Sequence, residues 1–418
     1  MAGSNEISSD KLFARCCIAG GGPAGLMLGF LLARAGIDVI VLEKHADFLR
    51  DFRGDTIHPS TLEVMHELGL LDQLLALPHE KVHRLTAQIG SKRLTLADFT
   101  HLPVRCGFIA FMPQWDFLDF LAVRARRYSG FRLLMETEAA DIIKDAQRVV
   151  GVRATTPKGS IEVRADLIVA ADGRNSILRD KTGLPVREFG APMDVLWFRL
   201  SRKPQDPAQT MGRFDSGGIF IIINRGKYWQ CGYVIGKGQF EAIRSAGLES
   251  LRKAIVQLAP YTKERVGELK SWQDVKLLTV RVNRLMQWFC PGLLCIGDAA
   301  HAMSPVGGVG INLAIQDAVA AANALAEPLR NRRSTIDDLR RVQKKREVPT
   351  RVTQRLQLAI QRRIIARVLD RTEPFKPPLL LRLISAIPFL QRIPARLIGL
   401  GIRPEHIKLA DSQNDVTK

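Results

Sequence analysis

The hydrophobic residues near the start of the chain follow first a strand-like and then a helix-like spacing. A short apolar run ends at Ala19, and residues 23–35 carry apolar side chains at the intervals of one helix face. Gly36 ends this stretch, and a β-branched run over residues 37–43 follows it. The pattern predicts a strand, a helix and a second strand within about 30 residues, which is a βαβ unit.

Glycine occupies the junction between the first predicted strand and the helix. Gly20, Gly22 and Gly25 give the spacing G-x-G-x-x-G. The first glycine allows a tight turn, the second lets a pyrophosphate reach the backbone, and the third lets helix and strand lie close. Glu43 ends the second strand, 23 residues after Gly20, at the place where a carboxylate accepts ribose hydroxyls. We predict a dinucleotide site rather than a purely structural glycine turn, with Ala24 and Lys44 among its lining residues.

Two later segments repeat the pattern of an apolar strand that ends in an acidic residue. Asp172-Gly173 follows one such run, and Gly297-Asp298 follows another. A loop rich in proline and glycine comes after Asp298 and leads into a long apolar helix. Such a loop offers bare backbone N–H groups at a helix N-terminus, which suits a carbonyl-rich or anionic ligand.

The three segments, in this order, resemble the FAD-dependent aromatic hydroxylases of the para-hydroxybenzoate hydroxylase type, which include ubiquinone-pathway hydroxylases. The resemblance covers roughly residues 12 to 330 and implies FAD, with NADPH or NADH as transient electron donor. Oxygen would then form a C4a-hydroperoxyflavin that hydroxylates the substrate. The cofactor-binding residues it implies are Gly20, Gly22, Ala24, Gly25, Glu43, Lys44, Arg53, Gln114, Asp172, Asp298, Pro305, Gly307, Gly310, Ile311 and Asn312.

No catalytic acid or base is assigned, and no metal site is expected. His58 and His301 are interpreted as structural residues. Phe214, Phe220, Ile222, Trp229 and Tyr233 supply apolar and aromatic surface in the predicted substrate domain, and the strand pairing decides which of them face a pocket. This favours a hydrophobic aromatic, phenolic or quinone-like substrate. The alternatives are a prenyl or lipid reductase, a halogenase (whose W-x-W-x-I-P signature is absent), and a non-catalytic, membrane-associated flavin-binding protein.

The expected fold is α/β, with a Rossmann-like FAD-binding domain interleaved with a mostly antiparallel β-sheet substrate domain and a C-terminal helical segment. A hairpin with Gly90 in its turn, and several short alternating runs after residue 183, predict the second sheet. We expect the FAD-binding domain at residues 1–81, 105–182 and 275–330, the substrate domain at 82–104 and 183–274, and the C-terminal cap at 331–418.

The C-terminal region carries much of the formal net charge of +19, with 14 Lys/Arg against 4 Asp/Glu between Arg330 and Arg371. We interpret it as helices interrupted near Pro349 that form a solvated cap, with peripheral membrane contact as the alternative. Nucleic-acid binding is not expected, because no aromatic platform accompanies the charges. The polar start and six cysteines without a C-x-x-C pair predict a cytoplasmic protein, or one bound at the inner face of a membrane. The oligomeric state is not predicted.

Overall fold

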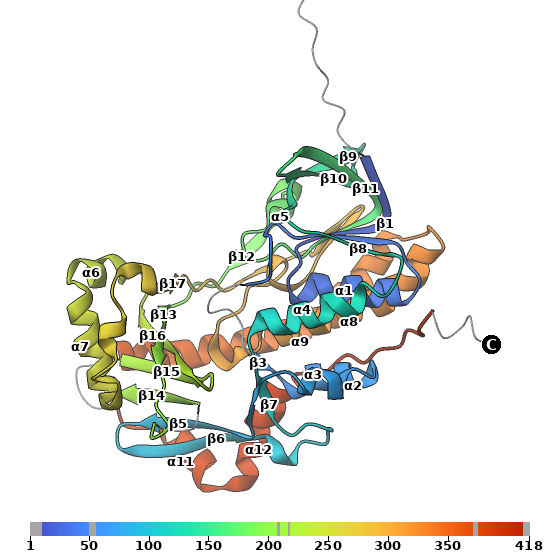
Figure 1. Ribbon diagram of the computed structural model, residues 1–418. Coiled ribbons are helices and arrows are strands. Elements are labelled where there is room, and N and C mark those ends of the chain that lie inside the picture. The colour runs from blue at the N-terminus through green and yellow to red at the C-terminus, as the bar shows by residue number, and fades with distance from the viewer. Residues whose placement is uncertain (1–10, 50–55, 207–209, 216–217, 371–374, 413–418) are drawn as a thin grey trace, which may run out of the picture.

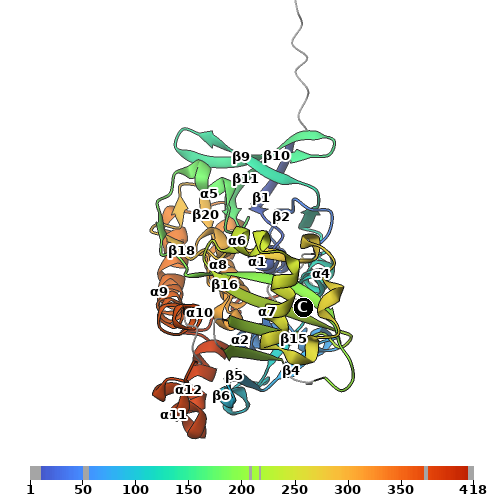
Figure 2. The same cartoon turned by 90° about the vertical axis from the view of Figure 1, so that its left-hand side faces the viewer.

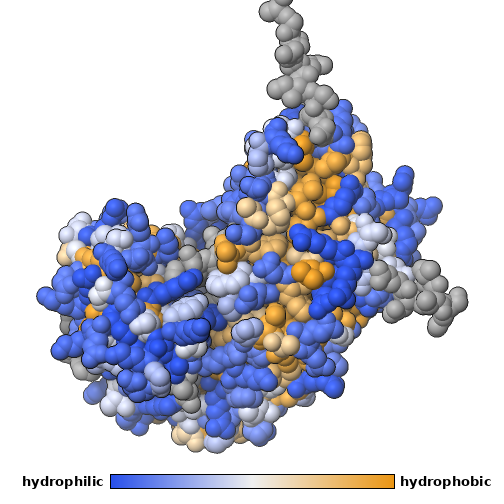
Figure 3. All heavy atoms as spheres, in the orientation of Figure 1, coloured by the Kyte–Doolittle hydropathy of each residue, from blue (hydrophilic) through white to orange (hydrophobic). Residues whose placement is uncertain are grey.

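The computed structural model describes residues 11–49, 56–206, 210–215, 218–370 and 375–412. Two sheets organise the molecule; the long helix α8 runs beside one of them, and α9, continued by α10, extends from that sheet to the other (Figure 1). We call the part built on the mainly parallel sheet the parallel-sheet unit, and the part built on the other large sheet the antiparallel-sheet unit. The space-filling view shows a hollow between the lobe that carries α6 and α7 and the upper part of the parallel-sheet unit (Figure 3).

The parallel-sheet unit contains the predicted βαβ unit. Its strands follow the order β19-β20-β11-β1-β2-β8, and all neighbours except β19 and β20 run parallel. The strands β1 and β2 and the helix between them confirm the element types expected from the first 43 residues. The bounds are β1 (Lys11–Ala19), α1 (Pro23–Arg34), β2 (Val39–Leu42), β8 (Phe131–Leu134), β11 (Gly159–Ala170), β19 (Phe289–Cys290) and β20 (Leu293–Cys295).

Helices cover one side of this sheet, and a smaller antiparallel extension covers the other. The helix α1 packs between α4 and α8, while β9 and β10 join the first half of β11 and face α5 (Figure 1). The core of the unit is fully apolar around β1, where Cys16, Cys17 and Ile18 have no exposed surface. The bounds are α4 (Gln114–Ala125), β9 (Glu138–Asp145), β10 (Arg148–Thr156), α5 (Ile177–Thr182) and α8 (Gly310–Arg330).

The antiparallel-sheet unit has the strand order β17-β13-β16-β15-β14-β5-β6, in which only β14 and β5 are parallel neighbours. The predicted hairpin is present, with Gly90 at φ 57° in its turn, and it joins the strands that follow residue 183. The predicted fold class is thereby confirmed. The bounds are β5 (Arg84–Ile89), β6 (Lys92–Asp98), β13 (Met193–Ser201), β14 (Met211–Asp215), β15 (Gly218–Asn224), β16 (Tyr228–Gly236), α6 (Phe240–Ser245), α7 (Leu248–Leu258) and β17 (Lys276–Leu278).

Short elements connect the two units. Three-stranded and two-stranded sheets form from strands that are far apart in the sequence. Their bounds, with those of two helices, are β3 (Thr56–Ile57), α2 (Pro59–Glu67), α3 (Leu71–Leu75), β4 (Glu80–Val82), β7 (Ile109–Phe111), β12 (Val186–Glu188) and β18 (Asn283–Leu285). Single 3₁₀ turns lie at Phe99–His101, Pro260–Thr262, Val266–Glu268, Trp272–Asp274, Gly297–Ala299 and Val306–Gly308.

The C-terminal helices differ from the prediction in one respect. The expected interruption near Pro349 is wrong, because α9 runs through this residue without a break. An interior proline costs a helix about 3 kcal/mol, but the buried face of α9, with Leu339 and Val342, packs along α8 and offsets that cost. After a π-turn (Gln361–Ile365) the bounds are α9 (Ile336–Ile360), α10 (Ala366–Leu369), α11 (Leu379–Ala386) and α12 (Pro388–Gly399).

One helical segment of the described residues, Val306–Arg330, is long and apolar enough to cross a bilayer, with a mean hydropathy of 1.3. Inside the protein, however, 83% of its apolar window is buried. This is the environment of a core helix. The segment from 400 to 412 leaves α12 and runs back along α8 and α2 to the end of α1, where the Ser412 N–H bonds the Arg34 carbonyl at 2.9 Å.

Candidate cofactor-binding site

Four neighbouring parallel strands end at one edge of the sheet, and each end carries part of the predicted motif. The strands are β20, β11, β1 and β2 in spatial order. Their ends lead to Asp298, Asp172, the glycine turn and Glu43, respectively. Ligands of open α/β sheets bind outside the carboxyl ends of such strands. Residues up to 278 positions apart in sequence therefore converge where a dinucleotide is expected.

Two of the motif glycines are required by the packing of the protein itself. Gly20 has φ 107°, and a Cβ there would lie 2.3 Å from the carbonyl oxygen of Ala171. A Cβ at Gly25 would lie 1.9 Å from the Gly20 carbonyl oxygen. Any side chain at these positions would push the turn away from β11 or lift α1 off β1.

Gly22 and Gly310 are glycines for a different reason. Neither has a positive φ, and a Cβ built on either one meets no atom of the described residues within 4 Å. Gly22 is the N-cap of α1, and Gly310 is the first residue of α8. The chain therefore keeps open space in front of two helix N-termini, which attract anionic and carbonyl-rich groups. This arrangement fits the phosphate and ring ends of a flavin dinucleotide.

Glu43 is fixed beside the glycine turn. Its side chain is 8% exposed, and its two carboxylate oxygens accept the N–H groups of Gly21 at 3.0 Å and His45 at 3.1 Å. A Cβ at Gly21 would lie 2.9 Å from the Cβ of Glu43, so the middle glycine makes room for this carboxylate. The predicted neighbours differ in position. Ala24 packs against Gly297, whereas Lys44 forms an exposed ion pair with Glu138 at 3.4 Å.

The two aspartates at the strand ends have different surroundings. Asp298 is 31% exposed and accepts a hydrogen bond from the guanidinium of Arg174 at 3.3 Å, which orients it at the open edge. Asp172 instead accepts the hydroxyl of Ser176 and, at 3.3 Å, the N–H of Leu178. Burial raises the pKa of Asp172 despite these bonds. Its carboxylate thus supports the first turn of α5, and cofactor contact by this residue stays a prediction.

The loop before α8 is clamped to the segment that starts at Thr56. The Thr56 hydroxyl donates to the Gly308 carbonyl at 2.8 Å, and a Cβ at Gly308 would lie 2.4 Å from the same hydroxyl oxygen. Gly307 has φ 80°, which shapes the loop after Pro305. Asn312 joins the same clamp through its side-chain amide, which bonds both the backbone N–H of His58 and the carbonyl of Thr56.

Of the remaining predicted residues, one lies next to this loop, one begins another helix, and one is outside the described part of the chain. Ile311 is 8% exposed in the first turn of α8. Gln114 is the first residue of α4, which packs on α1. Arg53 lies outside the described residues. None of the predicted cofactor contacts is tested by the geometry alone, so each stays a prediction.

A set of buried glutamines that was not predicted from the sequence holds the loop before α8 from the side of α9. Gln354, Gln357 and Gln361 of α9 and its π-turn are 1%, 3% and 0% exposed. Gln357 donates to the carbonyls of Ser304 at 3.0 Å and Val306 at 2.8 Å, and Gln361 donates to the Ser304 hydroxyl at 2.6 Å. Their spacing of three and four residues on one helix face was a visible signal within an otherwise basic segment.

Both histidines considered above are buried and held by the protein. His58 is the N-cap residue of α2 and its Nδ1 bonds the Ile398 carbonyl at 2.8 Å, so that nitrogen carries the proton. Burial lowers the pKa of His58 to about 4, although the bond to Ile398 opposes this shift. His301 bonds Asp317 through Nε2 at 2.6 Å. Burial would raise the pKa of Asp317, but His301 and Arg346 together hold it below its usual value.

The second sheet presents only one of its faces to the loop before α8. Side chains alternate along β15, so that Ile219, Ile221 and Ile223 belong to the apolar cluster that includes Val306. The strand pairing therefore divides the five apolar and aromatic residues noted in the predicted substrate domain between the two faces of the sheet. Only Phe214 of the five lies in this inner cluster, and the other four pack on the outer face in the cluster with α7: Phe220, Ile222, Trp229 and Tyr233.

The glycine turn, the acidic strand ends and the antiparallel-sheet unit define a dinucleotide-binding flavoprotein fold. The model of the family described as "FAD binding domain" matches residues 14–355. A 6-methylpretetramide 4-monooxygenase of Streptomyces rimosus is 32% identical over 337 residues, covering 79% of this chain and 80% of that protein. The chain belongs to this family of FAD-dependent aromatic hydroxylases.

Two further comparisons describe the breadth of the family. A dialkyldecalin synthase of Streptomyces rugosporus is 28% identical over 318 residues, which cover 72% of this chain and 63% of that protein. The solved structure of OxyS anhydrotetracycline hydroxylase from Streptomyces rimosus has a TM-score of 0.74 and 24% identity. The structural match covers 94% of this chain and 77% of the hydroxylase chain, and it supports the assigned fold.

Proposed function

We propose that this chain is an FAD- and NAD(P)H-dependent monooxygenase that hydroxylates a hydrophobic aromatic or phenolic compound. The observation that carries the proposal is the pair of side-chain-free spaces at Gly22 and Gly310, which lie before two helices of one site. The family relationship supplies the reaction class, and relatives named as monooxygenases support it. When bound, FAD supplies the redox chemistry that a side chain cannot perform.

In this scheme the chain's own residues bind and orient FAD and keep water away from its ring. The backbone at Gly22 and the N-terminus of α1 would hold the pyrophosphate, and Glu43 the ribose. The loop at 305–310 would lie against the ring system, held in place by Asn312 and Gln357. Asp298, oriented by Arg174, would accept a hydroxyl of the linking chain. Fixed backbone dipoles of this kind stabilise developing charge without reorganisation.

The substrate side of the site is proposed from the inner face of the antiparallel sheet. Trp197, Ile221 and Val306 belong to one apolar cluster beside the loop before α8. A surface of this composition favours an apolar aromatic body over a small charged acid. The 32% identical relative is named for a 6-methylpretetramide substrate. We therefore propose a hydrophobic aromatic or phenolic substrate without choosing a particular compound.

Steady-state measurements separate this function from its rivals. The purified flavoprotein would be given NADPH or NADH, with oxygen uptake, cofactor oxidation and product followed together over a panel of phenols, quinones and polycyclic aromatics. A monooxygenase consumes one oxygen and one reduced nicotinamide for each hydroxylated product. Reduction of a prenyl or lipid substrate without oxygen uptake would contradict the proposal. Product formation without consumption of oxygen or reduced nicotinamide would also contradict the proposal. This outcome is included because one of the relatives is named as a synthase.

We further propose that α11 and α12 contact an anionic membrane surface. These two helices form a hairpin that stands out from the lower edge of the molecule (Figure 2). Leu379, Leu380 and Phe389 are 68%, 65% and 66% exposed, and α11 buries none of its residues. Residues 375–404 contain five Lys/Arg and no Asp/Glu. An exposed apolar face rimmed only by cations fits anionic lipid, whereas a second copy of the same face would repel it.

Vesicle binding tests the membrane contact. We expect co-sedimentation at low salt with vesicles of phosphatidylglycerol and phosphatidylcholine, and weaker binding to phosphatidylcholine alone. Phe389→Asp should abolish binding, while Met286→Asp makes the same charge change at another exposed apolar residue (53% exposed) and should leave it intact. Equal binding by both variants, or a dimer that Phe389→Asp converts to a monomer, would contradict the proposal.

A further inference from the structure

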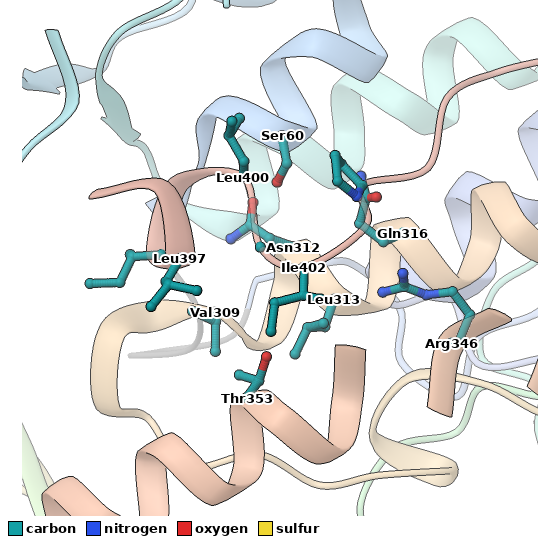
Figure 4. Close-up of a pocket in the computed structure, with 13 residues that line it drawn as sticks. Ser60, Val309, Asn312, Leu313, Gln316, Arg346, Thr353, Leu397, Leu400 and Ile402 are labelled. Atoms are coloured by element: carbon teal, nitrogen blue, oxygen red, sulfur yellow. The ribbon is translucent and has the colours of Figure 1, made fainter. Parts of the chain in front are cut away.

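A cavity lies between α8, α9 and the chain segment that follows α12. Its walls include Gln316 of α8, Arg346 and Thr353 of α9, and Ile402 of the covering segment (Figure 4). The cavity borders the start of α8 through Val309 and Asn312, but neither the glycine turn nor the acidic residues at the strand ends line it. No cofactor or substrate role described above uses the guanidinium of Arg346.

Arg346 reaches this cavity with hydrogen-bond donors that the protein does not use. Its side chain is 1% exposed, and its Nε donates to Asp317 at 2.9 Å. Its two terminal nitrogens, Nη1 and Nη2, are buried and have no hydrogen-bond partner among the described residues. A buried N–H group without an acceptor is energetically unfavourable, and more so when it is charged.

Gln316 contributes a third donor of the same kind. Its Oε1 accepts the backbone N–H of Glu405, which fastens the covering segment to α8. This bond fixes the orientation of the Gln316 amide, so Nε2 is the atom of the amide that remains available to donate. That nitrogen is also buried and without a partner in the part of the chain that is described. The cavity therefore combines three N–H-bearing nitrogens from two helices.

We propose that this cavity binds a small anion, such as a halide or a small carboxylate, through Arg346 and Gln316. A set of groups that can only donate selects a ligand that can only accept. Asp317 already pairs with Arg346, and it shares its other oxygen with His301 and with the N–H of Gly297. Asp317 holds the Nε of Arg346, and the bound anion would accept hydrogen bonds from Nη1 and Nη2. The anion would lie under the segment 400–405.

The position of the site connects the anion to two separate parts of the chain through the neighbouring residues Gln316 and Asp317 of α8. Arg346 connects through Asp317 to Gly297, the residue before Asp298. Gln316 connects to the covering segment at Glu405. Anion binding should therefore stabilise the closed arrangement of the C-terminal segment and the strand end at Asp298 together. This inference does not depend on the proposed hydroxylation.

Chloride is the first probe, with thermal unfolding of the full chain as the measurement. Potassium chloride would replace potassium gluconate at constant ionic strength. We expect a saturable rise of the unfolding midpoint of about 2 °C. Potassium formate in a parallel series distinguishes a small carboxylate from a halide. A saturable shift of the unfolding midpoint relative to gluconate, with either anion, supports the site. The absence of any saturable shift with both anions would overturn the proposal.

Gln316→Glu is the decisive variant, because Arg346 substitutions risk misfolding. Glutamate keeps an acceptor for the Glu405 N–H and places its second oxygen in the cavity beside Arg346. We expect this variant to unfold at a higher temperature than wild type in gluconate and to lose its response to chloride and formate. Arg355→Gln removes one exposed arginine from the same helix and should respond like wild type.

A bromide soak of crystals locates the ligand directly. An anomalous peak within hydrogen-bond distance of the Arg346 guanidinium supports the proposal. If Gln316→Glu retains the wild-type response, or bromide occupies only surface sites while the cavity holds solvent, the proposal is wrong.

Discussion

The side-chain oxygen of Asn312 accepts the backbone N–H of His58 at 2.8 Å, although the two residues are 254 positions apart. The same oxygen accepts the Thr61 hydroxyl at 2.8 Å, and the amide nitrogen donates to the carbonyl of Thr56 at 3.0 Å. One side chain therefore ties the start of α8 to the start of α2. This tie fixes the loop that the proposed function places beside the flavin ring.

Removing this tie should destabilise the whole protein. Asn312→Ala removes the bonds to the buried N–H of His58 and to the half-buried carbonyl of Thr56, so we expect the free energy of unfolding to fall by about 2–4 kcal/mol. Urea unfolding monitored by circular dichroism measures the change. Asn175→Ala, at an exposed position, should change it by less than about 0.5 kcal/mol. A loss of similar size in both variants would show that the amide of Asn312 is not the tie described above.

Glu43→Gln tests the contact proposed for the ribose. The amide has one acceptor oxygen instead of two and no negative charge, so charge-assisted bonds to the ribose hydroxyls are lost. We expect FAD affinity to fall by about tenfold to a hundredfold. Titration of apoprotein with FAD, followed by flavin fluorescence, measures the change. Glu241→Gln removes an exposed carboxylate on α6 of the antiparallel-sheet unit and should leave the affinity unchanged; equal affinities in the two variants would refute the contact.

His58 should make stability depend on pH. Burial lowers its pKa from 6.5 to about 4 in the folded protein, so the unfolded chain binds more protons between these values. Stability from this residue is therefore complete above pH 6.5 and falls by up to about 3 kcal/mol as the pH drops towards 4. Unfolding midpoints at pH 7.5, 6 and 5 should decline more steeply in wild type than in His58→Asn. Parallel declines would contradict the assignment.

Gln357 is proposed as a positioning residue for the same loop. Gln357→Ala removes donors to the carbonyls of Ser304 and Val306, so the loop beside the flavin should become less ordered. We expect a lower fraction of NAD(P)H oxidation to end in hydroxylated product, in addition to a stability loss of about 1–3 kcal/mol. Gln273→Ala, at an exposed turn, should preserve this coupling ratio. Unchanged coupling with lowered stability would limit Gln357 to a purely structural role.

The local parts of this protein were predictable from the sequence. The spacing of Gly20, Gly22 and Gly25, followed by Glu43, is contained in one βαβ unit whose geometry depends on neighbouring residues. The hairpin at Gly90 is equally local. These features follow from backbone freedom and from periodicity, which a sequence displays directly.

The contacts that cross the molecule were not predictable in the same way. Nothing near Asn312 in the sequence indicates that its side-chain oxygen accepts the backbone N–H of His58. The basic composition of α9 predicts a solvated cap and gives no sign that its glutamines bond the loop before α8. The face on which Phe220 and Ile222 lie depends on strand pairing, because a shift by one residue exchanges the two faces of a sheet. The continuous path of α9 through Pro349 likewise depends on packing against α8.

Gly22→Ala tests the central claim most directly, because no atom in the described part of the chain lies within 4 Å of the added Cβ. At an N-cap the change costs the apoprotein no more than about 1 kcal/mol, so folding should survive. Gly267→Ala, at another position with open space and ordinary φ, serves as the control. The measurement is the visible flavin absorbance that remains with each protein after reconstitution with FAD and gel filtration. We expect wild type and Gly267→Ala to retain FAD and Gly22→Ala to lose it; equal retention by all three would contradict the account.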